Sequence, residues 1–261
     1  MKLSVIIITK NEAGNLQACL DSVAFASQWI IVDSGSTDAT VAIARAAGAT
    51  VIETADWPGF GMQKNRALDA ATGDWILSLD ADERIPETLR EEIVAAMDSG
   101  THTAYALPRL SSFCGRFVHH AGWHPDYIVR LFKRGSARFS SDLVHESVVV
   151  DGKPASAEND ARVGKLRTPM IHYSYRDDET VLRKLDQYST LGARQAFHAG
   201  KRSGYATALA HSLAAFIRSY VFKRGFLDGA AGLMVSISSA ESTYHKYFKL
   251  MLLCEAERQA S

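Results

Sequence analysis

Two aspartates separated by a single alanine follow an apolar segment in the first third of the chain. The segment is 75–79, and Asp80 and Asp82 come directly after it. Carboxylate oxygens are ligands that Mg²⁺ and Mn²⁺ accept, and these ions readily share their coordination with a diphosphate. The pair therefore predicts a site for Mg²⁺ or Mn²⁺. An acidic turn that caps the helix expected from Pro86 would have the same residues.

Two further polar clusters follow apolar runs nearer the N-terminus. Thr9, Asn11 and Glu12 follow the first run, and Asp33 follows the second. A carboxylate at position 33 can accept hydrogen bonds from a nucleotide base or ribose. The alternative is that the polar residues after Asp33 only cap the next helix, for example through Asp38. Asn11 and Glu12 are equally able to begin a helix.

The elements that would position these clusters alternate between apolar runs and amphipathic segments. Strands are expected at 3–9, 29–32, 50–53 and 74–79, and helices at 15–26, 37–48, 61–71 and 86–97. This alternation with short links predicts a parallel sheet covered by helices. Ligands of such sheets bind beyond the carboxyl ends of the strands, where all three clusters lie. Lys64, on the helix before the fourth strand, either approaches the same ligand or is a solvated surface charge.

The second half of the chain has a different pattern. Strands are expected at 104–110, 127–133 and 144–150, separated by turn-rich loops that carry aromatic residues and histidines. From about Asp177 the pattern is helical. We therefore expect an α/β domain over 1–175 and a helical C-terminal region over 176–261.

Composition excludes several classes of protein. The chain has 261 residues, of which 47% are apolar, and its 29 Lys and Arg balance 29 Asp and Glu. A formal charge of zero argues against broad nucleic-acid binding. The three cysteines are widely spaced, which favours neither a disulfide framework nor a zinc knuckle and fits a reducing compartment. No run approaches the ~18 apolar residues of a membrane span, and the N-terminal run is expected to be a strand rather than a signal peptide.

Three sequence blocks resemble family 2 glycosyltransferases in their order and spacing. The blocks are SVIIITKNE, IIVDSGSTD and KNRALDAATGDWILSLDADE. The resemblance implies a GT-A fold, which is a Rossmann-like, mostly parallel sheet flanked by helices, here with a helical C-terminal extension. It also implies an inverting, metal-dependent hexosyltransferase in which Asp82 ligates the metal and Asp80 contacts ribose or metal. Many members of the family have two acidic residues where this chain has Asp33 and Ser34.

Blocks in the second half resemble a narrower group. GWHPDYIVRLFKRG, LVHESV, RSYVFKRGFLDGAAGL and YHKYFKL are similar to segments of the bacterial lipopolysaccharide core β-1,4-glucosyltransferases. This resemblance implies UDP-glucose as donor and an inner-core heptose of a lipid-linked saccharide as acceptor. It places the chain at the cytoplasmic face of a bacterial inner membrane. Another UDP-sugar transferase of polysaccharide or glycolipid synthesis would have the same features.

An inverting transfer requires a carboxylate that takes the proton from the acceptor hydroxyl. Glu146 and Asp126 are the candidates, and we favour Glu146 because similar enzymes place their base in this part of the chain. His145 either completes the metal shell or is a structural histidine. Trp123 and His124 are expected in the acceptor pocket, where a flat ring packs against a sugar face. These aromatic residues are equally compatible with a core position.

The helical tail mixes apolar side chains with many Lys and Arg. Phe216, Tyr220, Phe222 and Phe226 can face a bilayer interface while basic residues contact anionic head groups. We therefore expect peripheral membrane contact, against the alternative of a bundle that packs on the catalytic domain.

Three other functions have weaker support. A nucleotidyltransferase usually opens with a glycine-rich basic loop after its first strand, and TKNEAGN stands there instead. A glycoside hydrolase needs two carboxyls across one bond but no nucleotide site. An inactive sugar-nucleotide-binding module would not need Asp80, Asp82 and Glu146.

Overall fold

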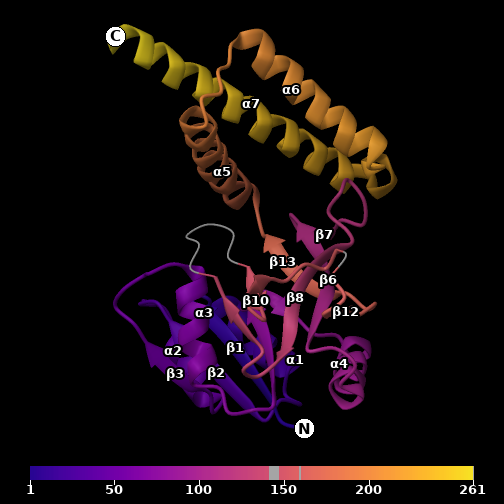
Figure 1. Cartoon of the computed structure of the whole chain (residues 1–261). Helices are drawn as coiled ribbons and strands as arrows, with labels where there is room; N and C mark the ends of the chain where they lie inside the picture. Colours follow the sequence, from indigo (N-terminus) through magenta and orange to yellow (C-terminus); the bar gives the residue numbers. More distant parts are fainter. Residues whose placement is uncertain (141–146, 159, 261) are drawn as a thin grey trace. The chain divides into compact units, whose positions relative to one another are not determined.

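The computed structural model describes residues 1–140, 147–158 and 160–260. The chain forms two compact units, shown as ribbons in Figure 1. The first comprises Met1–Arg109 and Asp126–His172, and the second comprises Leu110–Pro125 and Tyr173–Ser261. The segment 110–125 therefore belongs with the C-terminal helices rather than with the sequence around it.

The main sheet is mixed. Within the described residues its order is β3-β2-β1-β4-β8-β6-β13-β5, and β12 and β7 pair with β6. Its strands are β1 (Leu3–Thr9), β2 (Gln28–Asp33), β3 (Thr50–Glu53), β4 (Trp75–Asp80), β5 (Glu83–Arg84), β6 (Ala104–Phe113), β7 (Arg116–Phe117), β8 (Asp126–Lys133), β12 (Val163–Lys165) and β13 (Met170–Tyr175). The four strands β3, β2, β1 and β4 are parallel, as the alternating pattern predicts. Beyond β4 the sheet continues with the antiparallel pairs β4–β8 and β8–β6, and β12 joins β6 in parallel.

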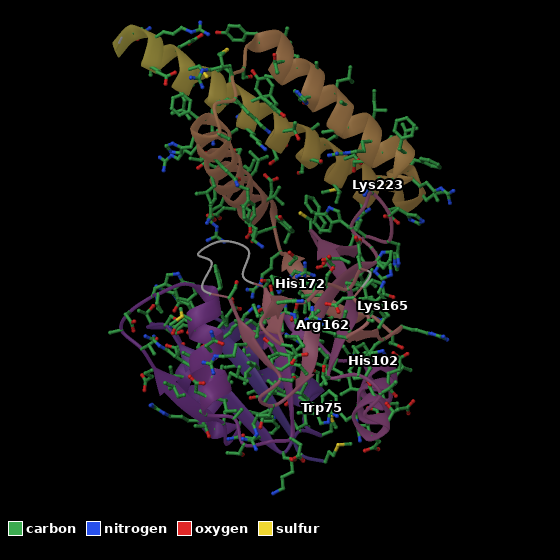
Figure 2. All side chains as sticks on the ribbon, viewed as in Figure 1. Trp75, His102, Arg162, Lys165, His172 and Lys223 are labelled. Carbon is green, nitrogen blue, oxygen red and sulfur yellow. The ribbon has the colours of Figure 1, made fainter. Side chains whose placement is uncertain are left out.

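The parallel strands are apolar on both faces because both faces are covered. Their helices are α1 (Ala13–Ser22), α2 (Thr40–Ala46), α3 (Phe60–Asp69) and α4 (Glu87–Ser99). Val5 and Ile7 pack with residues of α1, α2 and α4, whereas Ile6, one position along the strand, packs with residues of α3. Successive side chains of a strand point to opposite faces, so one strand supplies both cores. Trp75, labelled in Figure 2, is only 1% exposed within the first core.

A small second sheet completes this unit. It has the order β11-β10-β9 and is formed by β9 (Ala137–Phe139), β10 (Val148–Val150) and β11 (Lys153–Pro154). Phe139 and Val148 are cross-strand partners and belong to the same core as α3. Of the strand expected at 144–150, the part from 148 is confirmed, and residues 144–146 lie outside the described residues.

The second unit contains the helices α5 (Asp178–His198), α6 (Tyr205–Ile217), η1 (Arg218–Phe222), η2 (Gly225–Asp228) and α7 (Gly229–Ala260). The expected helical tail is confirmed, and α5 begins where the Asp177 carboxylate accepts a hydrogen bond from the Thr180 N–H. Gly232 lies on α7 where the η2 turn crosses it, and a Cβ there would stand 1.8 Å from the carbonyl oxygen of Gly225. Only glycine permits this close crossing. None of the helices in the described residues is long and apolar enough to span a membrane.

Candidate functional site

The three polar clusters come together at one edge of the parallel sheet. Thr9, the last residue of β1, pairs in register with Asp33, the last residue of β2. On the other side of β1, Ile8 pairs with Asp80, the last residue of β4. The Thr9 hydroxyl donates a hydrogen bond of 2.9 Å to Asp33. The fold therefore confirms the expectation from the sequence that the polar clusters lie at the carboxyl ends of neighbouring parallel strands.

Asp33 organises the loop that follows β2. Its carboxylate is 1% exposed and accepts hydrogen bonds from the backbone N–H groups of Gly35 and Ser36 and from the Ser36 hydroxyl. Gly35 has φ of +81°, which glycine adopts without strain. Asn11 closes the loop from the other side, because its side-chain oxygen accepts from the Thr37 N–H at 2.8 Å. Asp33 and Asn11 thus hold a tight turn at the strand ends.

Glu12 and Asp38 join the two helices that start at this edge. The Glu12 N–H donates to the Thr40 hydroxyl, and the Glu12 carboxylate accepts from the Asn15 amide, both at 2.8 Å. The Asp38 carboxylate accepts from the N–H of Ala13, the first residue of α1. It also accepts from the Thr40 N–H, so Asp38 contacts the start of α2. The helix begins at Thr40 rather than at 37, and its N-cap position is Ala39, without a side-chain cap, rather than Asp38.

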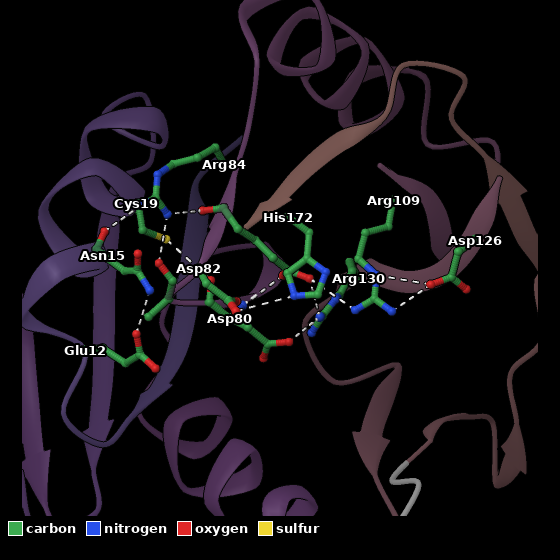
Figure 3. Close-up of polar contacts among 12 residues, drawn as sticks. Glu12, Asn15, Cys19, Asp80, Asp82, Arg84, Arg109, Asp126, Arg130 and His172 are labelled. Atoms are coloured by element: carbon green, nitrogen blue, oxygen red, sulfur yellow. Dashed lines mark hydrogen bonds and ion pairs between the residues drawn. The ribbon is translucent and has the colours of Figure 1, made fainter. Parts of the chain in front are cut away.

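Asp80 lies in a cluster of charges at the end of β4 (Figure 3). Arg130 of β8 donates to Asp80 at 2.6 Å and to Glu83 at 2.8 Å. Lys64 of α3 places its ammonium 3.5 Å from Asp80. The side chains of Arg130 and Lys64 are each 6% exposed and that of Glu83 is fully buried. Lys64 is therefore not a solvated surface charge, and Asp80 faces two buried cations.

Burial and the nearby cations shift the pKa values of Asp80 and Glu83 in opposite directions. Burial raises the pKa of Asp80, but the Arg130 guanidinium and the Lys64 ammonium outweigh it and hold that pKa well below its ordinary value. Burial raises the pKa of Glu83 despite the attraction of Arg130. Asp80 is therefore ionised at neutral pH, at the edge where a ligand would bind.

The depressed pKa of Asp80 predicts a pH dependence of stability. Its charge stabilises the fold at pH values above the unfolded pKa of 3.8, and this contribution is lost as the pH falls through the lower folded pKa. The free energy of unfolding of the wild type should therefore exceed that of Asp80→Asn at neutral pH. The difference should shrink between about pH 5 and pH 2. Urea unfolding of both proteins over this range measures it, and a constant difference would contradict the assignment.

Asp82 lies beside a histidine from a distant part of the chain. His172 of β13 pairs in register with Glu83 of β5, which brings its Nε2 within 3.4 Å of an Asp82 carboxylate oxygen. The Asp82 side chain is 24% exposed and the His172 side chain is 12% exposed. The sequence analysis missed His172, because 90 positions separate it from Asp82 and only the β5–β13 pairing joins them. The sequence shows only a histidine within the run MIHYSY, and this run does not indicate which residue the histidine contacts.

The donor atoms of Asp82 and His172 fit a divalent ion that also binds a substrate. No group of three or more His, Cys, Asp or Glu side chains able to hold a metal occurs in the described part of the chain. Mg²⁺ is commonly held by only one or two carboxylates together with substrate phosphates, and imidazole is a ligand of transition metals. The Asp82 carboxylate and the His172 imidazole, 3.4 Å apart, would supply the protein half of such a shell, and a diphosphate would supply the other half.

The comparisons with known proteins decide the family. A model of Glycosyl transferase family 2 matches residues 4–152, which is more than half of the chain. The chain belongs to the family 2 glycosyltransferases. It is therefore a sugar transferase, and the GT-A fold expected from the sequence blocks is confirmed by this match and by the sheet. The nucleotidyltransferase and hydrolase alternatives are set aside.

Relatives of this glycosyltransferase align over most of its length. The lipopolysaccharide core biosynthesis glycosyltransferase LpsC of Rhizobium meliloti (strain 1021) is 30% identical over 95% of this chain and 93% of its own. An uncharacterized glycosyltransferase of Rickettsia bellii (strain RML369-C) is 30% identical over 95% of this chain and 86% of its own.

Solved structures are similar at lower levels. S. aureus TarS 1–349 matches with a TM-score of 0.48 and 16% identity, over all of this chain and 92% of that one. A Mycobacterium tuberculosis glucosyl-3-phosphoglycerate synthase with Mn²⁺, uridine diphosphate and glucosyl-3-phosphoglycerate matches with a TM-score of 0.35 and 26% identity, over 44% of each chain.

The remaining predicted site residues of the glycosyltransferase fall in three places. Asp126, the first residue of β8, accepts two hydrogen bonds from the Arg109 guanidinium, at 3.1 and 2.7 Å. Arg109 also approaches Glu83 at 3.8 Å. Asp126 is therefore linked through Arg109 to the charged cluster that Arg130 forms with Asp80 and Glu83. Glu146 and His145 lie outside the described residues.

Trp123 and His124 belong to the second unit. Trp123 packs against the rings of Phe113 and Tyr175, with centroids 5.6 and 5.5 Å away. Its partners form a buried cluster with residues of α5 and α7. The ring of His124 lies 6.2 Å from that of His119. Trp123 thus has core contacts on part of its surface and remains partly exposed.

Proposed function

We propose that this glycosyltransferase transfers a hexose, glucose from UDP-glucose, with inversion of the anomeric carbon. The acceptor is an inner-core heptose of lipopolysaccharide or a similar lipid-linked saccharide, at the cytoplasmic face of a bacterial inner membrane. The observation that carries the proposal is the Asp82–His172 pair at 3.4 Å beside the ionised Asp80, at the carboxyl edge of the parallel strands. The LpsC relative in lipopolysaccharide core synthesis supports the acceptor.

The donor nucleotide would occupy the loops after β1 and β2. We infer that Thr9, Asn11, Glu12 and Asp33 shape the pocket for base and ribose, since their hydrogen bonds fix the turn that closes it. Asp80 would accept a hydrogen bond from ribose or approach the metal. Because the loops are held before any ligand arrives, the donor would bind without a large ordering cost.

The diphosphate would lie toward Asp82 and Lys64. Asp82 and His172 would hold Mg²⁺ or Mn²⁺, with His145 as a further candidate ligand. When bound, such an ion stabilises the negative charge that builds on the leaving diphosphate. Lys64 and Arg130 contribute positive potential at the same edge, and each is tied to Asp80. Fixed charges of this kind favour a transition state in which charge develops on the leaving group.

A carboxylate must take the proton of the acceptor hydroxyl during the inverting step. Glu146 is our first candidate, and Asp126 is the second. The Arg109 guanidinium engages one oxygen of Asp126 at 2.7 Å, which favours a positioning role for Asp126. Trp123 and His124 are proposed to line the acceptor side. We infer that 1–175 is the catalytic domain, and that 176–261 contacts the acceptor or the membrane.

The two candidate bases can be separated by conservative variants. Glu146→Gln should bind UDP nearly as the wild type does but lose transfer by on the order of 10²-fold or more, because the proton acceptor is removed. Asp126→Asn should reduce transfer less. Radiolabelled transfer from UDP-glucose to a heptose-terminated lipopolysaccharide, with UDP titrated in parallel, measures both effects. The reverse ranking would assign the base to Asp126.

A screen of donors tests the function as a whole. Purified protein is supplied with UDP-glucose, UDP-galactose or UDP-N-acetylglucosamine, an acceptor truncated after its inner-core heptoses, and Mn²⁺. We expect transfer from UDP-glucose to exceed that from the other two donors. Transfer from another UDP-sugar alone would retain the transferase but replace glucose. Hydrolysis or transfer with none of them would remove the proposal.

A further inference from the structure

One face of helix α6 is apolar and exposed. Tyr205, Leu209, Leu213 and Ile217 follow each other at intervals of four residues and are between 37% and 66% exposed. Side chains four apart lie above one another on a helix, so the four form one continuous strip. A helix within a folded unit normally buries its apolar strip, and this one does not.

The strip continues onto the segments that follow in the chain. Val221 and Phe222 of η1, Phe226 and Leu227 of η2, and Leu233, Met234 and Ile237 of α7 are each at least 39% exposed, and Phe222 reaches 78%. Between α6 and α7 lies an open groove of about 380 Å³, lined by Leu209, Ser212, Leu213, Phe216, Ile237, Ala240, Glu241 and Tyr244. We call the strip, its continuation and this groove the α6–α7 surface.

The charges around the α6–α7 surface are predominantly positive. Residues 187–241 contain six Lys or Arg and two acidic residues, Asp228 and Glu241, of which Glu241 is exposed and lines the groove. The Asp228 side chain is 6% exposed and is bound by His120 at 2.8 Å, so it does not offset the cations in solvent. Arg218 and Arg224 are exposed and flank Phe222 in the chain. Lys223 beside them is labelled in Figure 2 at the end of α6 nearest the start of α7.

We propose that the α6–α7 surface docks on an anionic lipid bilayer, with its apolar side chains in the interface and its cations on the head groups. Exposed aromatic and aliphatic residues next to an excess of Lys and Arg over carboxylates are the combination that binds such a surface. A second copy of the chain is a poorer occupant. A two-fold contact would bring each set of cations onto the same set, with only one exposed carboxylate, Glu241, on each copy of the surface to offset them.

Vesicle flotation of the full chain tests this inference without donor or acceptor, so it does not depend on the proposed activity. Phosphatidylcholine vesicles are compared with vesicles in which about one-third of the lipid is phosphatidylglycerol. The wild type should bind the anionic vesicles at least about tenfold more tightly than the neutral ones. Leu213→Ser/Phe222→Ser and Arg218→Gln/Arg224→Gln should each weaken binding to the anionic vesicles by about tenfold or more.

Two matched controls use residues away from the α6–α7 surface. Leu182→Ser on α5 removes a side chain that is 54% exposed, and Lys153→Gln/Arg167→Gln removes two exposed charges; neither should change binding by more than about twofold. Circular dichroism confirms folding of every variant. Equal binding by all variants, or equal binding to neutral and anionic vesicles, would overturn the inference. So would a dimer in sedimentation velocity that Leu213→Ser/Phe222→Ser dissociates while vesicle binding stays unchanged.

Discussion

Asp82→Ala is expected to lower the rate of sugar transfer by at least about 10³-fold while leaving the fold intact. A divalent ion across a leaving diphosphate contributes several kcal/mol to the stability of the transition state, and about 4 kcal/mol corresponds to roughly 10³ in rate. Asp82 is 24% exposed and has no part in the buried core, so its removal should not unfold the protein. Initial rates at saturating donor, with the melting temperature as a check, measure the effect.

The matched control is Asp98→Ala, which removes an exposed carboxylate on α4. It should leave the rate within about twofold of the wild type. His172→Ala should resemble Asp82→Ala in direction, and both variants should require more Mn²⁺ for half-maximal activity. Full activity of Asp82→Ala at the Mn²⁺ concentration that saturates the wild type would remove the metal assignment.

Arg130→Met is expected to destabilise the fold by about 3–5 kcal/mol, because it leaves a buried charge without its partner. Arg130 is the cation that Asp80 and the fully buried Glu83 share, at 2.6 and 2.8 Å. The free energy of unfolding in urea measures the loss. Arg130→Met/Glu83→Gln should recover part of it, since the second change removes the uncompensated carboxylate.

An exposed ion pair provides the comparison. Arg90 and Glu87 pair on α4 at 3.0 Å, with side chains 46% and 68% exposed. Arg90→Met should cost less than about 1 kcal/mol, because solvent screens such pairs. If Arg130→Met cost no more than Arg90→Met, the buried cluster would not have the structural role assigned to it.

The parallel half of the fold could be predicted because each piece of evidence was local. A buried parallel strand is a continuous apolar run, and 3–9, 29–32, 50–53 and 74–79 are runs of this kind followed by polar residues. The rule that ligands bind at the carboxyl ends then placed Asp33 and Asp80 at one edge, which the register of β1 with β2 and β4 confirms.

The contacts that complete the site are not local. Arg130 reaches Asp80 only because β8 runs antiparallel beside β4, and His172 reaches Asp82 only through the short β5–β13 pairing. β5 has two residues, too few for any periodic pattern. Lysine is usually a surface residue. Lys64 is buried because of the way α3 packs, and the sequence alone does not show which side chains of that helix are covered.

The same limit applies to the helical region. Its helices were expected from the mixture of apolar and basic residues, but helical spacing alone does not separate a face that packs from one that remains exposed. The structure distinguishes them: Ala208 and Ala215 of α6 are buried, whereas Leu209 and Leu213 are more than 60% exposed. Small side chains face the unit because they allow α6 and α7 to approach closely, and the large apolar ones are left outside.

Calorimetric titration of UDP into the purified protein tests the central claim most directly, namely that the edge formed by Asp33, Asp80 and Asp82 is a metal-assisted nucleotide-sugar site. We expect binding in the presence of Mn²⁺ that weakens at least about tenfold when the metal is chelated, and that shows no such dependence in Asp82→Ala. Equal binding with and without Mn²⁺ would contradict the metal assignment. No binding in either condition would contradict the assignment of a UDP-sugar as donor.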